Sequence, residues 1–311
     1  MSQAPAQPSR HVQLDDKYTL QHGRAYMTGI EALVRLPMLQ QQRDQARGLN
    51  TAGFISGYRG SPLGGVDQAM WQAKAFLKSR NIHFQPGVNE ELAATAVWGS
   101  QQNQLFKGSR FDGVFGLWYG KGPGVDRSMD VIKHANAFGT APNGGVLVVA
   151  GDDHACKSST LPNQSEHMFI GASVPVLAPA NVQEVLDLGL FGWELSRFSG
   201  CWVALKAITE NMDSAISASI DANRISIQIP DGFELPEGGV SARWPDKPLD
   251  QERRLNKYKI YAAREFARVN NLNPIVIDSP NPRLGIICSG KAYLDVMQAL
   301  EDIGIDEGAA A

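Results

Sequence analysis

The segment AGFISGYRGSPLGG, residues 52–65, decides the fold class of this 311-residue chain. Its first five residues are mostly apolar and strand-sized, and the glycine-rich stretch from Gly57 to Gly65 predicts a sharp loop. A helix is predicted from about Val66 to Lys78. A strand that passes through a tight loop directly into a helix is the unit from which parallel sheets are built.

The same alternation repeats along the rest of the chain. Further strands are predicted at 114–118, 145–150, 174–177 and 202–207, and helices at 90–106, 125–137 and 182–197. A capping-box pattern from Thr28 to Glu31 predicts the start of an earlier helix. Short strands separated by helices of this length indicate an α/β fold, with a parallel sheet covered by helices on both faces.

Composition divides the chain into four parts. We interpret residues 1–17, which are polar and contain two prolines, as a flexible leader, and 18–229 as the α/β domain. Proline and glycine crowd together after residue 229, so 230–270 is interpreted as an interdomain linker followed by a charged packing helix. Residues 271–311 would then begin a second α/β domain.

This second domain is predicted from one strand and one helix. Leu284–Cys288 is apolar and strand-like, Gly290 marks a loop, and Tyr293–Ile303 has a helical pattern. So short a unit cannot bury enough surface to be stable alone. We therefore expect that the chain is truncated or lacks a partner.

Charge and hydropathy exclude several classes of protein. The chain has 29 basic and 32 acidic residues, a net charge of −3, which gives no reason to expect a nucleic-acid partner. Its apolar stretches are much shorter than the roughly 20 residues needed to cross a bilayer, and the N-terminus lacks the apolar core of a secretory signal. A cytoplasmic protein without membrane association is expected.

The cysteines and the acidic loop do not match a metal-site pattern. Cys156, Cys201 and Cys288 are widely separated, which argues against a disulfide framework and excludes a four-cysteine iron–sulfur cluster made by this chain alone. Asp152, Asp153, His154 and His167 are possible ligand types, but their spacing matches no zinc signature. No metal site is predicted, and the polar stretch that follows Gly151 is interpreted as an active-site or subunit-contact loop.

Two glycine motifs fail the tests for nucleotide binding. Gly60 and Gly65 have the spacing of a P-loop, but Val66 and Asp67 stand where a Lys-Ser/Thr pair would hold phosphates. The segment Gly120–Gly124 lacks the spacing of a dinucleotide fingerprint. Neither motif predicts a nucleotide site.

The loop after residue 56 is nevertheless a candidate ligand site. It follows the carboxyl end of a predicted parallel strand, where α/β sheets usually bind ligands. Arg59 offers a forked cation suited to a carboxylate, and Ser61 offers a hydroxyl group. The alternative interpretation is a glycine-rich turn without a ligand.

Glu90 is the second candidate. It lies at a predicted loop-to-helix junction, with Glu91 next to it. An acidic residue in the first turn of a helix is favoured by the helix dipole alone, so these residues by themselves are compatible with either a capping or a catalytic role.

In their order and spacing, these segments resemble the pyrimidine-binding domain of the 2-oxoacid:ferredoxin oxidoreductases. The resemblance is greatest to the long, fused indolepyruvate ferredoxin oxidoreductases, and it extends over most of the chain. The segments that carry it are Gly57–Gly64, Gly87–Glu91, Gly120–Gly124 with the helix that follows to His134, Gly151–His154 with Ser158 and Ser159, and Leu284–Gly290.

The resemblance implies a thiamine-diphosphate enzyme in which Glu90 is catalytic. In this family the matching glutamate hydrogen-bonds the aminopyrimidine ring of the cofactor and favours its imino tautomer. If the register differs by one residue, Glu91 takes this place. Gly57, Tyr58 and Gly60 are implied to contact the cofactor.

The resemblance also implies a substrate site, although the motif departs from the family pattern. Ser61 matches a hydroxyl residue beside the substrate, and Arg59 is a candidate partner for its carboxylate. The commoner form of this loop is Gly-Tyr-Pro-Gly-Thr-Pro, so Arg59 replaces a proline and Ser61 a threonine.

The reaction implied is the oxidative decarboxylation of 2-oxo acids, with indolepyruvate-like aryl pyruvates as substrates, acyl-coenzyme A as product and ferredoxin as electron acceptor. Magnesium, the cofactor's diphosphate and the iron–sulfur clusters are expected on other domains, because the chain has no Gly-Asp-Gly…Asn signature. The isolated chain is therefore expected to be inactive until it meets a pyrophosphate-binding domain of the same longer chain or of a dimer mate. The alternatives are a non-redox thiamine enzyme, similar to transketolase or a decarboxylase, and a non-catalytic module on a degenerate thiamine fold.

Overall fold

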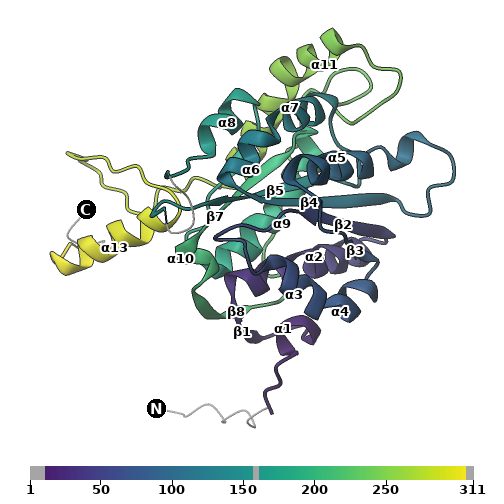
Figure 1. The fold of residues 1–311 in the computed structure, drawn as a ribbon. Coiled ribbons are helices and arrows are strands. Elements are labelled where there is room, and N and C mark those ends of the chain that lie inside the picture. Colours follow the sequence, from purple (N-terminus) through teal and green to yellow (C-terminus); the bar gives the residue numbers. More distant parts are fainter. Residues whose placement is uncertain (1–10, 157–160, 306–311) are drawn as a thin grey trace.

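A computed structural model describes residues 11–156 and 161–305 of the chain (Figure 1). Its centre is a parallel sheet with the strand order β3-β2-β4-β5-β7-β6. The strands of this sheet are β2 (Thr51–Gly57), β3 (Ile82–Phe84), β4 (Gly113–Lys121), β5 (Val146–Asp152), β6 (Val176–Leu177) and β7 (Val203–Ile208). Strand β5 is buried along its whole length, as expected for a central strand with both faces covered.

Helices cover both faces of the sheet (Figure 1). One face packs against α2 (Gly29–Ala46), α3 (Val66–Gln72), α4 (Lys74–Lys78) and α9 (Val182–Ser199). The other face packs against α5 (Glu90–Ser100), α6 (Gly122–Arg127), α7 (Met129–Phe138) and α8 (Glu166–Gly171). Each layer has its own apolar core, so the predicted α/β fold is confirmed.

Local sequence signals predicted the element starts well. Thr28 caps α2, and the Glu31 side chain accepts a hydrogen bond from the Thr28 backbone N–H at 2.9 Å, which confirms the capping box. The helix predicted from residue 66 is broken near Ala73 into α3 and α4. The helix predicted at 90–106 ends at Ser100, and a short 3-10 turn, Asn103–Leu105, follows.

Several elements were not predicted from the sequence. Strand β3 has only three residues, too few for a periodic signal. Strands β1 (Arg24–Thr28) and β8 (Ala215–Ser219) pair antiparallel in a separate two-stranded sheet, although they are far apart in sequence. Two short helices, α1 (Asp16–Thr19) and α10 (Thr209–Met212), were also missed.

The charged helix predicted after the linker is confirmed. It consists of α11 (Pro248–Arg254), a π-helical stretch (Leu255–Lys259) and α12 (Ile260–Val269), and α12 packs against α9. Lys259 is wholly buried, and its Nζ donates to the carbonyl oxygens of Asn136 and Ala137 at 2.9 and 3.0 Å. The π-helical stretch is therefore tied to the last turn of α7.

The strand predicted at Leu284–Cys288 is wrong for this structure. These residues lie within the described range 161–305 and form no strand, whereas the helix after them is present as α13 (Lys291–Asp302). A strand needs a neighbour to satisfy its backbone groups, and here Ile287 is fully exposed and Leu284 is 80% exposed. Residues 284–288 have the apolar pattern of a strand, but no described strand pairs with them.

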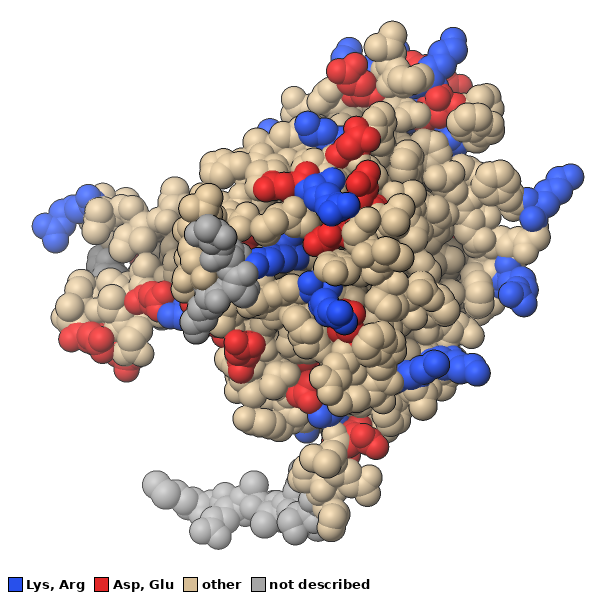
Figure 2. Space-filling model, viewed as in Figure 1, with Lys and Arg blue, Asp and Glu red and all other residues tan. Residues whose placement is uncertain are grey.

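The surface of the molecule mixes charges of both signs. On the face viewed in Figure 2, acidic and basic side chains are interspersed, and neither sign forms an extended patch. Among residues 11–156 and 161–305, no helix is both long and apolar enough to cross a membrane.

Candidate active site at the carboxyl edge of the sheet

All strands of the main sheet are parallel, so their carboxyl ends meet at one edge. The loops after β2 and β3 are joined there. The Tyr58 N–H donates to the Tyr119 carbonyl oxygen at 3.0 Å, and the Gly87 N–H donates to the Gly57 carbonyl oxygen at 2.8 Å. The glycine-rich loop and the segment before Glu90 therefore lie side by side.

Gly57 is required by its close approach to β4, and Gly60 is tightly packed against the same strand. A Cβ atom at Gly57 would lie 2.2 Å from the Tyr119 carbonyl oxygen, and one at Gly60 would lie 3.0 Å from the Lys121 Cβ. Without side chains, the backbone can run against the neighbouring strand. Tyr58 and Arg59 are exposed on this edge.

Ser61 is half-buried at the turn into α3. The structure thus brings Gly57, Tyr58, Gly60, Arg59 and Ser61 together on one loop at the predicted edge of the sheet. Their contacts with a cofactor or a substrate remain predictions.

Glu90 begins helix α5 at the same edge. The preceding residue, Asn89, caps the helix, since its side-chain oxygen accepts the Leu92 N–H at 2.9 Å. On the β4 side, the Trp118 indole N–H donates to the Glu90 carbonyl oxygen at 2.9 Å. The backbone at position 90 is thus fixed from two directions, and the capping contact is made by the neighbouring asparagine.

The Glu90 side chain lies against Gly124, in the first turn of α6. A Cβ atom at Gly124 would lie 2.4 Å from the Glu90 Cγ and 2.8 Å from its Oε1. Glu90 is half-buried, whereas Glu91 is exposed. The Glu90 carboxylate accepts no hydrogen bond from any residue that the structure describes, so an uncommitted acid lies beside a glycine at this edge.

A buried pair beneath the glycine-rich loop was missed by sequence reasoning. The Tyr119 hydroxyl donates to the Asp67 Oδ1 at 2.5 Å. Burial raises the pKa of Tyr119, the hydrogen bond to Asp67 raises it further, and the nearby charge of Arg59 opposes the shift. Asp67 is the residue that breaks the P-loop pattern, and its place in the fold is to hold β4 against α3.

Asp152, the last residue of β5, is anchored by its neighbours. Asp152 is wholly buried, and its Oδ1 accepts the Ser165 hydroxyl at 2.7 Å, while Lys206 Nζ lies 3.7 Å from its Oδ2. Burial raises the pKa of Asp152, and the hydrogen bonds from Ser165 partly oppose this. We therefore assign Asp152 a structural role, in which it holds the end of β5 to Ser165 and Lys206.

The remaining parts of the polar loop after β5 give no metal centre in the described chain. Nowhere in 11–156 or 161–305 do three or more His, Cys, Asp or Glu side chains gather in a group that could hold a metal ion. Ser158 and Ser159, which contributed to the family resemblance, lie outside the described residues.

Comparisons with known proteins agree with this fold and with one another. A family model described as the indolepyruvate ferredoxin oxidoreductase middle domain matches residues 273–311. The indolepyruvate oxidoreductase subunit IorA of Pyrococcus horikoshii is 25% identical over 263 residues, which cover 82% of this chain and 37% of that protein. The IorA subunit of Methanothermobacter marburgensis is 25% identical over 298 residues, covering 95% of this chain and 44% of that protein.

Among solved structures, a 2-oxoglutarate:ferredoxin oxidoreductase from Magnetococcus marinus, with 2-oxoglutarate, coenzyme A and succinyl-CoA bound, superposes with a TM-score of 0.63. It is 16% identical, and the match covers 91% of this chain and 52% of that one. The chain therefore shares its α/β fold with part of that structure. Both the family model and the sequence relatives therefore make the chain similar to indolepyruvate oxidoreductases. It spans less than half the length of the curated relatives that it matches.

Proposed function

We propose that this chain forms the pyrimidine-binding side of a thiamine-diphosphate site in an enzyme that oxidatively decarboxylates 2-oxo acids. The substrates proposed are indolepyruvate-like aryl pyruvates, the product is acyl-coenzyme A, and ferredoxin accepts the electrons. One observation carries the proposal: the half-buried Glu90 carboxylate, without a described hydrogen-bond partner, lies against Gly124 at the carboxyl edge of the sheet.

The residues at this edge fit the cofactor proposed. An unpartnered carboxylate can share a proton with a ring nitrogen, and the Gly57–Ser61 loop lies at the same edge of the sheet as Glu90. When bound, thiamine diphosphate supplies the electron sink that decarboxylation of a 2-oxo acid requires. Glu90 would hold the proton at its carboxylate, while Gly57, Tyr58 and Gly60 would line the ring.

Arg59 and Ser61 are the proposed substrate-binding residues. The exposed Arg59 guanidinium can donate two parallel hydrogen bonds to the carboxylate of a 2-oxo acid. Ser61 lies two residues further along the same loop and can donate its hydroxyl to the oxo group. In these roles, the two residues would set the orientation of the substrate.

The surroundings of Glu90 favour completion of the site by another domain. Val88 and Leu92, which flank it, are 83% and 54% exposed, and apolar side chains beside a functional group are typical of a contact surface. The proposed partner is a pyrophosphate-binding domain, from the same longer chain or from a dimer mate. It would hold Mg²⁺ and the diphosphate, while further domains carry the iron–sulfur clusters, so the isolated chain would be inactive.

The test is to replace Glu90 by Gln in the complete enzyme, with Glu91→Gln as the matched control. Loss of the acid should lower turnover about 100-fold or more, the usual contribution of a general acid–base group, while the control keeps wild-type turnover. Binding of thiamine diphosphate measured by calorimetry, and thermal unfolding, separate loss of chemistry from loss of the fold.

Wild-type turnover in Glu90→Gln would refute the assignment. Reduction of ferredoxin coupled to consumption of the 2-oxo acid distinguishes this enzyme from a non-redox thiamine enzyme of the same fold. Failure of the complete enzyme to bind the cofactor would identify a non-catalytic module.

A further inference from the structure

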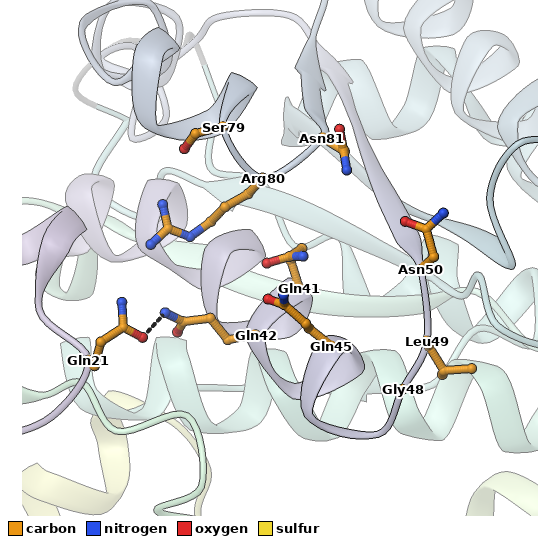
Figure 3. A pocket seen from close by; sticks show the side chains of 10 residues that line it. All are labelled: Gln21, Gln41, Gln42, Gln45, Gly48, Leu49, Asn50, Ser79, Arg80 and Asn81. Atoms are coloured by element: carbon orange, nitrogen blue, oxygen red, sulfur yellow. Dashed lines mark hydrogen bonds between the residues drawn. The ribbon is translucent and has the colours of Figure 1, made fainter.

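A polar hollow of about 660 Å³ lies at the amino edge of the sheet, opposite the candidate active site. It is bordered by the second half of α2, by the turn that leads into β2 and by the turn between α4 and β3 (Figure 3). Arg80 extends its guanidinium toward Gln42, whose amide donates to Gln21 at 2.5 Å. None of the ten described residues that line the hollow is acidic.

Arg80 is a half-buried cation with little compensation. Its one described polar contact is a long hydrogen bond of 3.4 Å from Nη1 to the Phe76 carbonyl oxygen. Burial lowers the pKa of Arg80. A guanidinium normally donates to several acceptors, so Arg80 retains free donor positions.

A second guanidinium lies behind the wall of the hollow. Arg35 is wholly buried, and it donates to the carbonyl oxygens of Tyr18 and Leu20, each at 2.6 Å. Its Nη2 is also 3.5 Å from the Oε1 of Gln42, a lining residue. Burial, reinforced by the positive charge of Arg80, lowers the pKa of Arg35 to about 10.

The local charge balance is therefore positive. Within the described ranges, no carboxylate forms an ion pair with Arg35 or Arg80. The carboxyl end of α2 faces the hollow and contributes a partial negative charge of about half an elementary charge. Two guanidinium charges exceed this, so an anion that entered the hollow would be stabilised.

Neutral donors complete the arrangement. The side chains of Gln41, Gln45 and Asn81 line the hollow, and none of them makes a hydrogen bond to another residue of the described chain. Amide N–H groups around one forked cation match an acceptor that has several oxygen atoms. The hollow is also large enough to hold more than a bare ion.

We propose that this hollow is a binding site for a small polar molecule with a phosphate or carboxylate group. Arg80 contacts the anionic group, Gln41, Gln45 and Asn81 donate to its oxygens or to neighbouring hydroxyls, and Arg35 adds charge from behind. The hollow lies at the amino edge of the sheet and Glu90 at the carboxyl edge, so the site binds without taking part in the chemistry.

The test is a titration of the full chain with inorganic phosphate and, separately, with citrate, at constant ionic strength. Binding is followed by calorimetry and by the NMR signals of the Gln41, Gln45 and Asn81 side-chain amides. The variants are Arg80→Gln, and Arg283→Gln as a charge-matched control at an exposed position.

Saturable binding that weakens about tenfold or more in Arg80→Gln, while the control binds like wild type, supports the site. Preference for phosphate or for citrate identifies which anionic group the site selects. No saturable binding of either anion, or equal binding in Arg80→Gln and wild type, overturns the proposal. Thermal unfolding without ligand should show that Arg80→Gln is folded, because the substitution removes one of two mutually repelling cations.

Discussion

Replacement of Gly124 by Ala is the most direct test of how the candidate active site is built. The new Cβ would lie 2.4 Å from the Glu90 Cγ, whereas carbon atoms in contact normally lie about 3.5–4.0 Å apart. Glu90 must therefore move by roughly 1 Å. A displacement of that size in a catalytic group can reduce the rate about 100-fold.

The expected effect on the fold is much smaller. Alanine is favoured over glycine in a helix by about 1 kcal/mol, and overpacking typically costs about 1–3 kcal/mol. These terms largely offset each other, so the free energy of unfolding should fall by about 1 kcal/mol, which is small beside the expected loss of turnover.

The assay compares turnover, affinity for thiamine diphosphate and thermal unfolding of the complete enzyme. Gly99→Ala is the matched control, because Gly99 lies in α5, the helix that Glu90 begins, and a Cβ there meets nothing within 4 Å. In a Glu90→Ala background, the destabilisation by Gly124→Ala should disappear. Wild-type turnover in Gly124→Ala, or a destabilisation that is independent of residue 90, would refute the proposed packing of Glu90.

Two further predictions concern stability. Arg197 donates to both carboxylate oxygens of the buried Asp44, at 2.6 and 2.8 Å. Arg197→Met would leave this carboxylate buried without its cation, so the free energy of unfolding measured by urea denaturation should fall by about 3–5 kcal/mol. Asp44→Leu in the same chain should recover part of this, and a loss below 1 kcal/mol would contradict the pairing. Burial lowers the pKa of Lys259 to about 8 from its ordinary 10.5, so protonation of this lysine destabilises the folded state. The free energy of unfolding should therefore rise by at most about 3 kcal/mol as the pH increases from 8 to 10.5. This rise is measured in a Cys201→Ala background, because burial also raises the pKa of Cys201, and titration of that thiol would lower the free energy of unfolding. If the rise persists unchanged after Lys259→Met, Lys259 is not its source.

Much of the molecule was predictable because the signals are local. Strand β2, the glycine-rich loop and helix α3 follow each other within a few residues, and the capping box at Thr28 defines the start of α2 by contacts over three residues. Caps and hydrophobic periodicity act over such short distances, so they can be read from the chain alone. The same reasoning placed Glu90 at the first residue of a helix.

Other features depended on contacts between distant segments. The pairing of β1 with β8 joins residues about 190 positions apart, for example Arg24 with Ser219, and no local pattern indicates it. The apolar stretch 284–288 has the pattern of a strand, yet it forms none, because a strand exists only where a neighbour accepts its hydrogen bonds.

The candidate site likewise combines features that local sequence predicts with features that depend on tertiary packing. The sequence by itself determined that two acids, Glu90 and Glu91, begin a helix that follows a short loop. Only the tertiary structure decided that Glu90 turns inward against Gly124 while Glu91 faces solvent. The physical reason is that neighbouring residues of a helix point in directions about 100° apart, and the choice between them is made by whichever strand and loop pack against the helix.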